Sequence, residues 1–164
     1  MDKKYFPIFI DISKKKIVVI GGGTIATRRV NTLLQFAGQI VVVAPELTVK
    51  LRELTEKGKI TWLCGEYCME QIADADMVVA ATNQPEVNHQ VKADCNRAEK
   101  SGGRQILVSV IDAKELCDFY FPSIVENEGI VIGINSGGKS PAKTKSVRKK
   151  IEEILASESV YKKE

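Results

Sequence analysis

The chain has 164 residues, of which 44% are hydrophobic and 27% charged. This length suits one globular unit with a substantial core and excludes two domains of ordinary size, while the composition excludes a disordered or collagen-like chain. The 24 Lys and Arg residues nearly balance the 21 Asp and Glu residues, a net charge of +3 that argues against a dedicated nucleic-acid binder.

Membrane insertion and export are also disfavoured by the sequence. No apolar run approaches the length that crosses a bilayer. The opening stretch "MDKKYFPIFIDIS" has few apolar residues and no small-residue cleavage site after them. We therefore expect a cytoplasmic protein whose partners include neither membrane nor nucleic acid.

The cysteines and the histidine give little support to a metal site. The four cysteines lack any C-x-x-C spacing, and His89 is the only histidine. The cysteines are therefore expected to be buried thiols, or thiols without a functional role, in a reducing compartment. His89 falls within a helical stretch and is expected at its surface, and no metal ligand is assigned.

Short β-rich runs alternate with helical patterns through the first two-thirds of the chain. The strands are expected at Lys16–Ile20, Gln39–Ala44, Lys59–Leu63, Asp76–Thr82 and Gln105–Ile111. Several are continuously apolar, which is typical of parallel strands covered on both faces by helices. The intervening helices are expected within residues 24–38, 47–59 and 85–103, with stops at Gly38, at Gly58 and at Gly102 and Gly103. This alternation predicts an α/β fold with a Rossmann-like, doubly wound parallel sheet.

The pattern changes after Asp112. Two β-like runs surround Glu128 and Gly129 and predict an antiparallel hairpin. Ser140 can then cap, and Pro141 open, a last helix over about residues 142–156. A hairpin with one helix is too small to bury itself well, so we expect this C-terminal extension to form a homodimer.

The first strand runs directly into a glycine turn in the stretch "KIVVIGGGTIATRR". Gly21, Gly23 and Ala26 match the G-x-G-x-x-G/A dinucleotide fingerprint, in which the glycines make a tight turn and let a pyrophosphate approach the backbone. The pyrophosphate would lie at the N-terminus of the following helix. Because the motif follows a strand and opens a helix, dinucleotide binding is favoured over a purely structural turn.

The end of the second strand bears on the choice of cofactor. Enzymes selective for NAD usually carry an acid here for the ribose hydroxyls, and Glu46, after Pro45, is the first acid. Two interpretations stay open: Glu46 reaches the ribose, or it is a first-turn carboxylate that complements the dipole of the next helix. No pair of arginines is present for a 2′-phosphate, so NAD is favoured over NADP.

Ligands of open α/β sheets bind beyond the carboxyl ends of the strands. This rule selects Thr82 and Asn83 after the fourth strand and Asp112 after the fifth. Asp112 can place a carboxylate near the nicotinamide, or it can make an Asx-type turn that closes the strand. The residues alone favour the turn.

Five segments in succession resemble the siroheme-synthase dehydrogenase family, the precorrin-2 dehydrogenases: residues 6–34, "VVVAPEL", "VVAATNQPEVN", "SVIDAKELCDFYFPSIV" and "INSGGKSPAKTKSVRKKIE". The resemblance extends from about Phe6 to Ile154. It departs from the family pattern at Ser109 and Lys114, where members commonly have Asn and Pro.

The resemblance implies NAD-dependent oxidation of precorrin-2 to sirohydrochlorin in siroheme biosynthesis, with ferrochelatase activity left open. It implies a nucleotide-binding domain over residues 1–113 and a dimerising, substrate-binding extension over residues 114–164. It assigns Asp112 to catalysis and Ser136 to the "SGG" loop. Backbone contacts to NAD are implied around Thr24 and Ile25 and at Pro45 and Glu46.

The candidate site residues follow from the fingerprint, the strand ends and the resemblance together. The cofactor-binding set is Gly21, Gly22, Gly23, Thr24, Ile25, Pro45, Glu46 and Thr82. Precorrin-2 carries eight carboxylates, so Arg28, Ser136, Gly137 and Lys139 are expected to bind it through positive charge and backbone amides.

Two other functions fit the sequence less well. A non-enzymatic, dimeric NAD-sensing module explains the fingerprint and the basic run of residues 139–150, but not the "SGGKSP" loop that accompanies the Asp112 segment. A dehydrogenase of a small hydroxy acid is disfavoured because the sequence lacks a well-placed His/Asp pair for alcohol oxidation.

Overall fold

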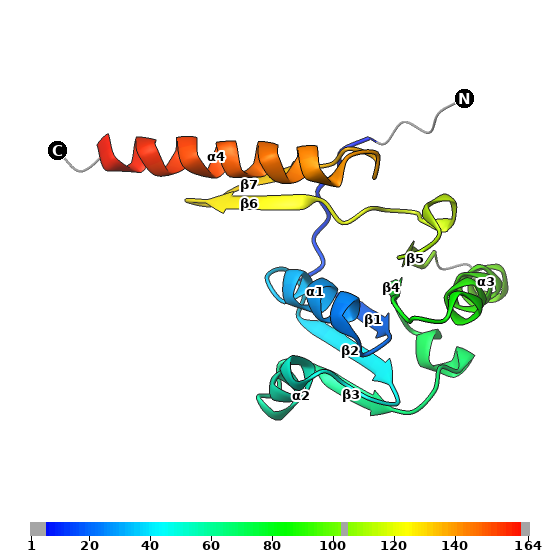
Figure 1. Cartoon of the computed structure of the whole chain (residues 1–164). Helices are drawn as coiled ribbons and strands as arrows, with labels where there is room; N and C mark the ends of the chain where they lie inside the picture. The colour runs from blue at the N-terminus through cyan, green and yellow to red at the C-terminus, as the bar shows by residue number, and fades with distance from the viewer. Residues whose placement is uncertain (1–5, 103–104, 162–164) are drawn as a thin grey trace. The chain divides into compact units, whose positions relative to one another are not determined.

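The structure is a computed structural model that describes residues 6–102 and 105–161, with side chains as far as Ser157. The chain divides into two compact units, which are described separately (Figure 1). The first comprises Ile10–Phe119, and the second joins residues 6–9 to residues 120–161.

The first unit is built on a five-stranded parallel sheet. Its strands are β1 (Lys16–Ile20), β2 (Gln39–Ala44), β3 (Thr61–Cys64), β4 (Met77–Ala80) and β5 (Leu107–Val110). They lie in the order β3-β2-β1-β4-β5. The helices between them are α1 (Thr24–Leu33), α2 (Val49–Glu56) and α3 (Pro85–Gly102), with short 3₁₀ turns η1 (Met69–Ile72) and η2 (Lys114–Leu116). The predicted Rossmann-like sheet is therefore confirmed, and its order reverses between β1 and β4, where such folds bind ligands.

The core of this unit lies in the central strands. In β1 the residues Ile17, Val18 and Val19 have no exposed surface, and Val78 and Val79 of β4 have none either. Consecutive residues of a strand point to opposite faces, so burial of every position requires cover on both sides. The continuous apolar runs in the sequence are explained by this arrangement.

Several predicted boundaries were wrong, and two of them are informative. The first helix ends at Leu33 and not at Gly38, because the chain turns with Phe36 and Ala37 both donating to the Leu33 carbonyl. Gly38 serves a different purpose: a Cβ there would lie 2.3 Å from the backbone oxygen of Ser13. The third strand is Thr61–Cys64, two residues later at its start than expected.

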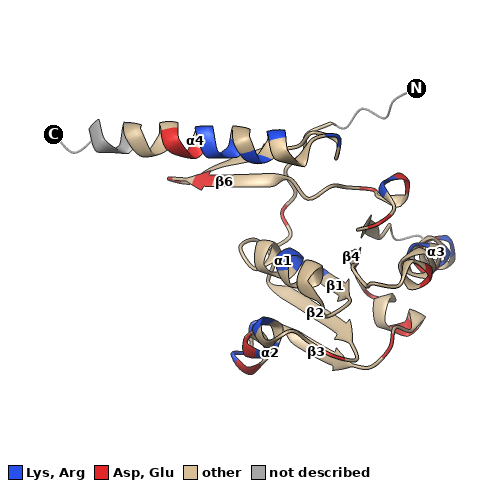
Figure 2. Cartoon of the chain, viewed as in Figure 1, with Lys and Arg blue, Asp and Glu red and all other residues tan. Residues whose placement is uncertain are grey.

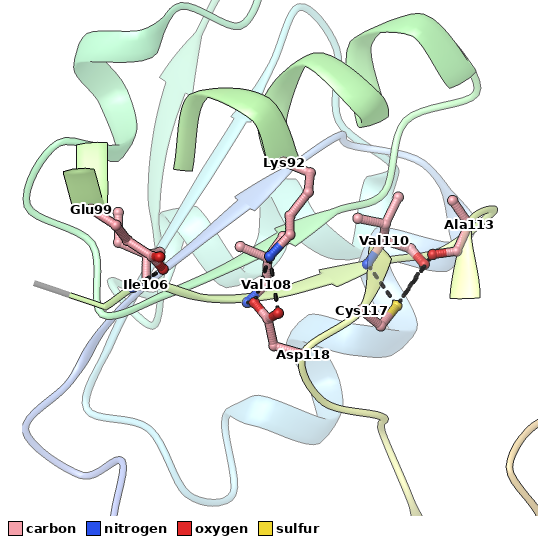
Figure 3. A network of polar contacts seen from close by, with 8 residues as sticks. All are labelled: Lys92, Glu99, Ile106, Val108, Val110, Ala113, Cys117 and Asp118. Atoms are coloured by element: carbon pink, nitrogen blue, oxygen red, sulfur yellow. Dashed lines mark hydrogen bonds and ion pairs between the residues drawn. The ribbon is translucent and has the colours of Figure 1, made fainter. Parts of the chain in front are cut away.

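The outer edge of β5 is covered by the segment that follows η2 (Figure 3). The Asp118 carboxylate accepts from the Val108 amide at 2.9 Å, and the Asp118 amide donates to the Val108 carbonyl at 2.8 Å. The Cys117 sulfur lies 3.2 Å from both the nitrogen and the oxygen of Val110. Lys92 of α3 completes the contact by donating to Asp118. These bonds satisfy edge groups of β5 and fix the loop between β5 and Cys117, which carries Asp112.

The second unit contains the predicted hairpin and last helix. Strands β6 (Ser123–Asn127) and β7 (Ile130–Ile134) pair antiparallel, and α4 spans Pro141–Tyr161 and packs against β6. The Ser140 hydroxyl accepts from the Lys143 amide at 3.4 Å, so the predicted cap is confirmed. Within the described part of the chain, no helix combines the length and the apolar character that a membrane span requires.

The turn between β6 and β7 offers a test of this hairpin. Glu128 has φ 48° and Gly129 has φ 82°, as in a two-residue turn with both central residues left-handed. This conformation costs about 1 kcal/mol at a residue such as Glu but less at Asn. We expect Glu128→Asn to raise the free energy of unfolding by about 0.5 kcal/mol, measured by urea denaturation. Glu126→Asn on β6 is the control and should lower it; stabilisation by both variants, or by neither, contradicts the assignment.

Candidate functional site

A broad cavity lies at the carboxyl ends of the parallel strands. Its volume is about 1120 Å³, which is sufficient for a large cofactor. Its walls come from the segments that follow β1, β2, β3 and β4, together with the first turns of α3. All eight predicted cofactor-binding residues line it: Gly21, Gly22, Gly23, Thr24, Ile25, Pro45, Glu46 and Thr82.

The glycine turn is held close to the ends of two neighbouring strands. Gly21 has φ 119°, and a Cβ there would lie 2.4 Å from the Ala81 oxygen. Gly22, which the fingerprint leaves unspecified, is still more confined, because a Cβ would lie 1.9 Å from the Glu46 oxygen. The turn therefore requires glycine at both positions for the backbone to pass between the ends of β2 and β4.

The next residue opens toward the cavity. Gly23 is the N-cap of α1, and a Cβ at Gly23 would meet nothing within 4 Å. No described side chain caps this end of α1, and its first turn contains no acid. The amides of Thr24 and Ile25 therefore belong to a helix N-terminus whose positive dipole end is available to an anion. Ala26 is fully buried against the sheet, as the small third residue of the fingerprint must be.

These features fit a dinucleotide. The backbone narrows at Gly21 and Gly22, stays open at Gly23 and ends in a helix N-terminus, which is the combination that a pyrophosphate needs. The residues that would hold the pyrophosphate are thus Gly23, Thr24 and Ile25.

Glu46 lies in the wall of the cavity and outside α2. That helix begins at Val49 after Thr48, whose hydroxyl caps it by accepting from the Leu51 amide at 3.4 Å. The alternative interpretation of Glu46 as a first-turn carboxylate is therefore wrong, because Glu46 precedes the cap. Glu66 and Glu86 also line the cavity, and none of the described lining residues is Lys, Arg or His.

Asp112 is connected to the cavity wall by a residue that the sequence analysis did not select. Asn88 of α3 is fully buried, and its amide nitrogen donates to the Asp112 carboxylate at 3.1 Å. The Asn88 side chain also accepts from the Thr82 amide at 3.0 Å and donates to the Thr82 carbonyl at 3.1 Å. Asn88 therefore ties the carboxylate to the cofactor-binding segment after β4. The exposed Asp112 carboxylate thus has a side-chain partner on α3.

A signal for Asn88 was present in the sequence. Asn88, Val91 and Cys95 are spaced by three and four residues and form the buried face of α3. A polar side chain on such a face must find hydrogen-bond partners inside the protein. His89, the neighbouring residue, is exposed on the helix as predicted.

The predicted substrate-binding residues are placed in both units. Arg28 is exposed on α1, whereas Ser136, Gly137 and Lys139 belong to the loop before α4 in the second unit. In that loop the Ser136 hydroxyl accepts from the Ser140 amide at 3.2 Å. The amides of Gly137 and Lys139 donate to Asn135 and to Ser136. The amides of Gly137 and Lys139 are thus engaged within the loop.

The sheet order, the glycine turn and the open helix end define a dinucleotide-binding α/β domain of the Rossmann type. Residues 8–123 match the family described as "Putative NAD(P)-binding", and the chain belongs to this NAD(P)-binding family. The expectation of a nicotinamide dinucleotide cofactor is thereby confirmed.

Similar proteins agree with the resemblance found in the sequence. A siroheme synthase of Mannheimia succiniciproducens is 38% identical over 151 residues, which cover 92% of this chain and 30% of that protein. The "Probable multifunctional siroheme biosynthesis protein HemA" of Ruminiclostridium josui is 45% identical over 150 residues, which cover 91% of this chain and 28% of that protein. The chain thus spans less than a third of the length of these curated relatives.

A solved structure extends the similarity to the fold. The structure of "SirC, precorrin-2 dehydrogenase" aligns with a TM-score of 0.72 and 26% identity, covering 91% of this chain and 70% of that one. The similarity includes the C-terminal hairpin and helix, because the alignment covers nearly all of this chain. The predicted resemblance to the siroheme-synthase dehydrogenase family is confirmed.

Proposed function

We propose that the chain is an NAD-dependent dehydrogenase that oxidises precorrin-2 to sirohydrochlorin in siroheme biosynthesis. The observation that carries this proposal is the link of Asp112 through Asn88 to Thr82 in the wall of the dinucleotide cavity. The similarity to precorrin-2 dehydrogenase and to siroheme synthases supplies the substrate.

The reaction removes a hydride and a proton from the macrocycle. Bound NAD supplies the hydride acceptor. Asp112 receives the proton or orients the macrocycle, and its exposed carboxylate is held for this purpose by the buried Asn88. The segment Cys117–Asp118 fixes the other end of the same loop through its bonds to β5.

The acidic cavity wall supports NAD over NADP. Glu46, Glu66 and Glu86 line the cavity without a described basic residue among its lining. A 2′-phosphate near a carboxylate is repelled, and like charges brought together at a binding site cost several kcal/mol.

We expect the NADP dissociation constant to exceed that of NAD by at least about tenfold in isothermal titration calorimetry. Glu46→Gln should narrow this ratio by strengthening NADP binding. Glu56→Gln, at the exposed end of α2, is the control. Equal binding of the two cofactors by the unaltered protein would refute the assignment of Glu46.

We further propose that residues 114–164 form a homodimerising and substrate-binding extension that follows a nucleotide-binding domain of residues 1–113. Ile130 is 59% exposed, and Ile154 of α4 is 57% exposed, although both belong to apolar runs. A second copy of the chain that covers these two side chains would explain their presence.

The first half of α4 is strongly basic (Figure 2), with Lys143, Lys145, Lys149 and Lys150 all exposed. This charge, with Lys139 of the same unit, suits a substrate with eight carboxylates, and Arg28 is the candidate in the other unit.

We place the reaction in the cytoplasm. All four cysteines are free thiols, Cys95 and Cys117 buried and Cys64 and Cys68 exposed. Unpaired thiols are typical of a reducing compartment. The proposal leaves iron or cobalt insertion open. Among the described residues, no group of three His, Cys, Asp or Glu side chains is placed to hold a metal ion.

The test is anaerobic incubation of the protein with precorrin-2 and NAD. We expect sirohydrochlorin and NADH to form in equal amounts, followed by their absorption spectra, without added metal. The Michaelis constant for precorrin-2 should rise with salt, because exposed charges are screened. Failure to form either product refutes the proposal. An NAD-sensing module, the alternative, has no reason to retain sirohydrochlorin in equilibrium dialysis, whereas the dehydrogenase should bind it.

A further inference from the structure

The cavity has a polar wall that the fingerprint does not explain. Tyr67, which follows β3, and Gln90 of α3 both line the cavity. Both are bonded to one carboxylate: Tyr67 donates to Asp94 at 3.0 Å, and the Gln90 amide nitrogen donates to Asp94 at 2.9 Å. Asp94 itself is only 3% exposed, and Arg97 neutralises it at 3.0 Å. A buried carboxylate is therefore used to fix two side chains at the surface of the cavity.

The sheet order indicates which half of a dinucleotide this wall faces. The pyrophosphate site lies at β1, and the order β3-β2-β1-β4-β5 places the segments after β2 and β3 on one side of it. Asp112 follows β5, on the opposite side. If Asp112 acts on the reacting ring, as in the proposed function on which this step rests, the nicotinamide half extends toward β5. The adenosine half then extends toward β2 and β3, where Glu46 and Tyr67 are found.

The polar groups of this wall offer hydrogen-bond acceptors to a ligand that carries an N–H donor. The Tyr67 hydroxyl donates its hydrogen bond to Asp94. Burial together with that hydrogen bond raises the pKa of the phenol well above its usual value, so the phenol stays protonated. The Gln90 amide nitrogen donates one of its two N–H groups to the same carboxylate. Because its only O–H is engaged, the phenol oxygen can offer a ligand nothing but an acceptor, and the Gln90 carbonyl oxygen is a second acceptor.

We infer that Tyr67 and Gln90, held by Asp94, recognise the exocyclic amino group of the adenine base. Adenine presents an N–H donor at this position, whereas hypoxanthine presents a carbonyl oxygen, which cannot bond to the phenol oxygen because the phenol proton is engaged by Asp94. The site therefore selects the adenine dinucleotide over its deaminated analogue.

The test is equilibrium binding of NAD and of nicotinamide hypoxanthine dinucleotide to the full chain by isothermal titration calorimetry. We expect NAD to bind at least about tenfold more tightly, since an acceptor that the bound base covers and leaves without a donor loses about that factor. Gln90→Met removes the acceptor while keeping the side-chain length. It should reduce the ratio to less than about threefold by weakening NAD binding, with the analogue nearly unaffected. Tyr67→Phe should also reduce the ratio.

The matched control is Asn96→Met, which removes an exposed amide from the same helix outside the cavity. It should retain the full ratio, and circular dichroism should show all three variants folded. Equal and measurable binding of both dinucleotides by the unaltered protein overturns this inference and leaves the proposed function intact. A full ratio in Gln90→Met overturns it as well. Binding of neither dinucleotide contradicts the proposed NAD site itself and this inference with it.

Discussion

Replacement of Asp112 by Asn is expected to lower the turnover number about 100-fold or more, with the dissociation constant of NAD nearly unchanged. The reason is that Asn keeps the size of the side chain and retains an oxygen that accepts from Asn88, whose amide lies 3.1 Å from the carboxylate. Only the charge and the capacity to take a proton are removed. Turnover is measured by NADH formation from precorrin-2, and NAD affinity by calorimetry.

The control for this variant is Glu115→Gln, which neutralises another exposed carboxylate of the same loop. It should leave turnover within about twofold of the unaltered protein, because a surface charge outside the site has a small effect. Near-normal turnover in Asp112→Asn would remove Asp112 from the mechanism. An equal loss in both variants would show that the loop responds to its total charge and not to one base.

The second large effect is expected at the glycine turn. Replacing either of two adjacent glycines by Ala should have a different consequence, one for NAD affinity and the other for stability. At Gly23 the added methyl group meets no protein atom within 4 Å and φ is −84°, so the protein should fold normally. The methyl group then occupies the open side of the cradle, and NAD affinity should fall at least about 100-fold. Calorimetry measures this loss, and thermal unfolding checks that stability is retained.

At Gly22 the expected effect of Ala is on stability and not, in the first place, on NAD affinity. A methyl group there would lie 1.9 Å from the Glu46 oxygen, which belongs to the backbone and cannot move without displacing the end of β2. We expect Gly22→Ala to lose about 1–3 kcal/mol of stability, as overpacked sites do, whether or not NAD is present. Full stability of Gly22→Ala, or unimpaired NAD binding by Gly23→Ala, would contradict the described turn.

The fold was largely predictable because its signals are local and repeated. The bounds of β1 and β2 were predicted without error, since each is a continuous apolar run that ends at a glycine turn or at Pro45. The hairpin turn at Glu128 and Gly129 and the start of α4 were also predicted, from a turn dipeptide and a cap. The end of α1 was not, because Gly38 is set by its approach to Ser13, far from it in the sequence.

The candidate site was only partly predictable. Residues of the glycine turn and the strand ends were found because a motif and a topological rule select them. Asn88, Tyr67 and Asp94 were missed because their role arises from contacts between α3 and segments that follow three different strands. The importance of Gly22 also depends on a close approach to Glu46 that the spacing of the motif does not encode.

The central claim is that a nicotinamide dinucleotide binds at the Gly21–Gly23 turn with its reactive ring on the side of Asp112. The structure of a crystal of the protein, grown with NAD or soaked in it, tests this most directly. We predict electron density for the pyrophosphate at the start of α1, with the nicotinamide toward the end of β5 and the adenosine toward β2 and β3. A dinucleotide bound outside this cavity, or lying in the reverse direction within it, would contradict the account.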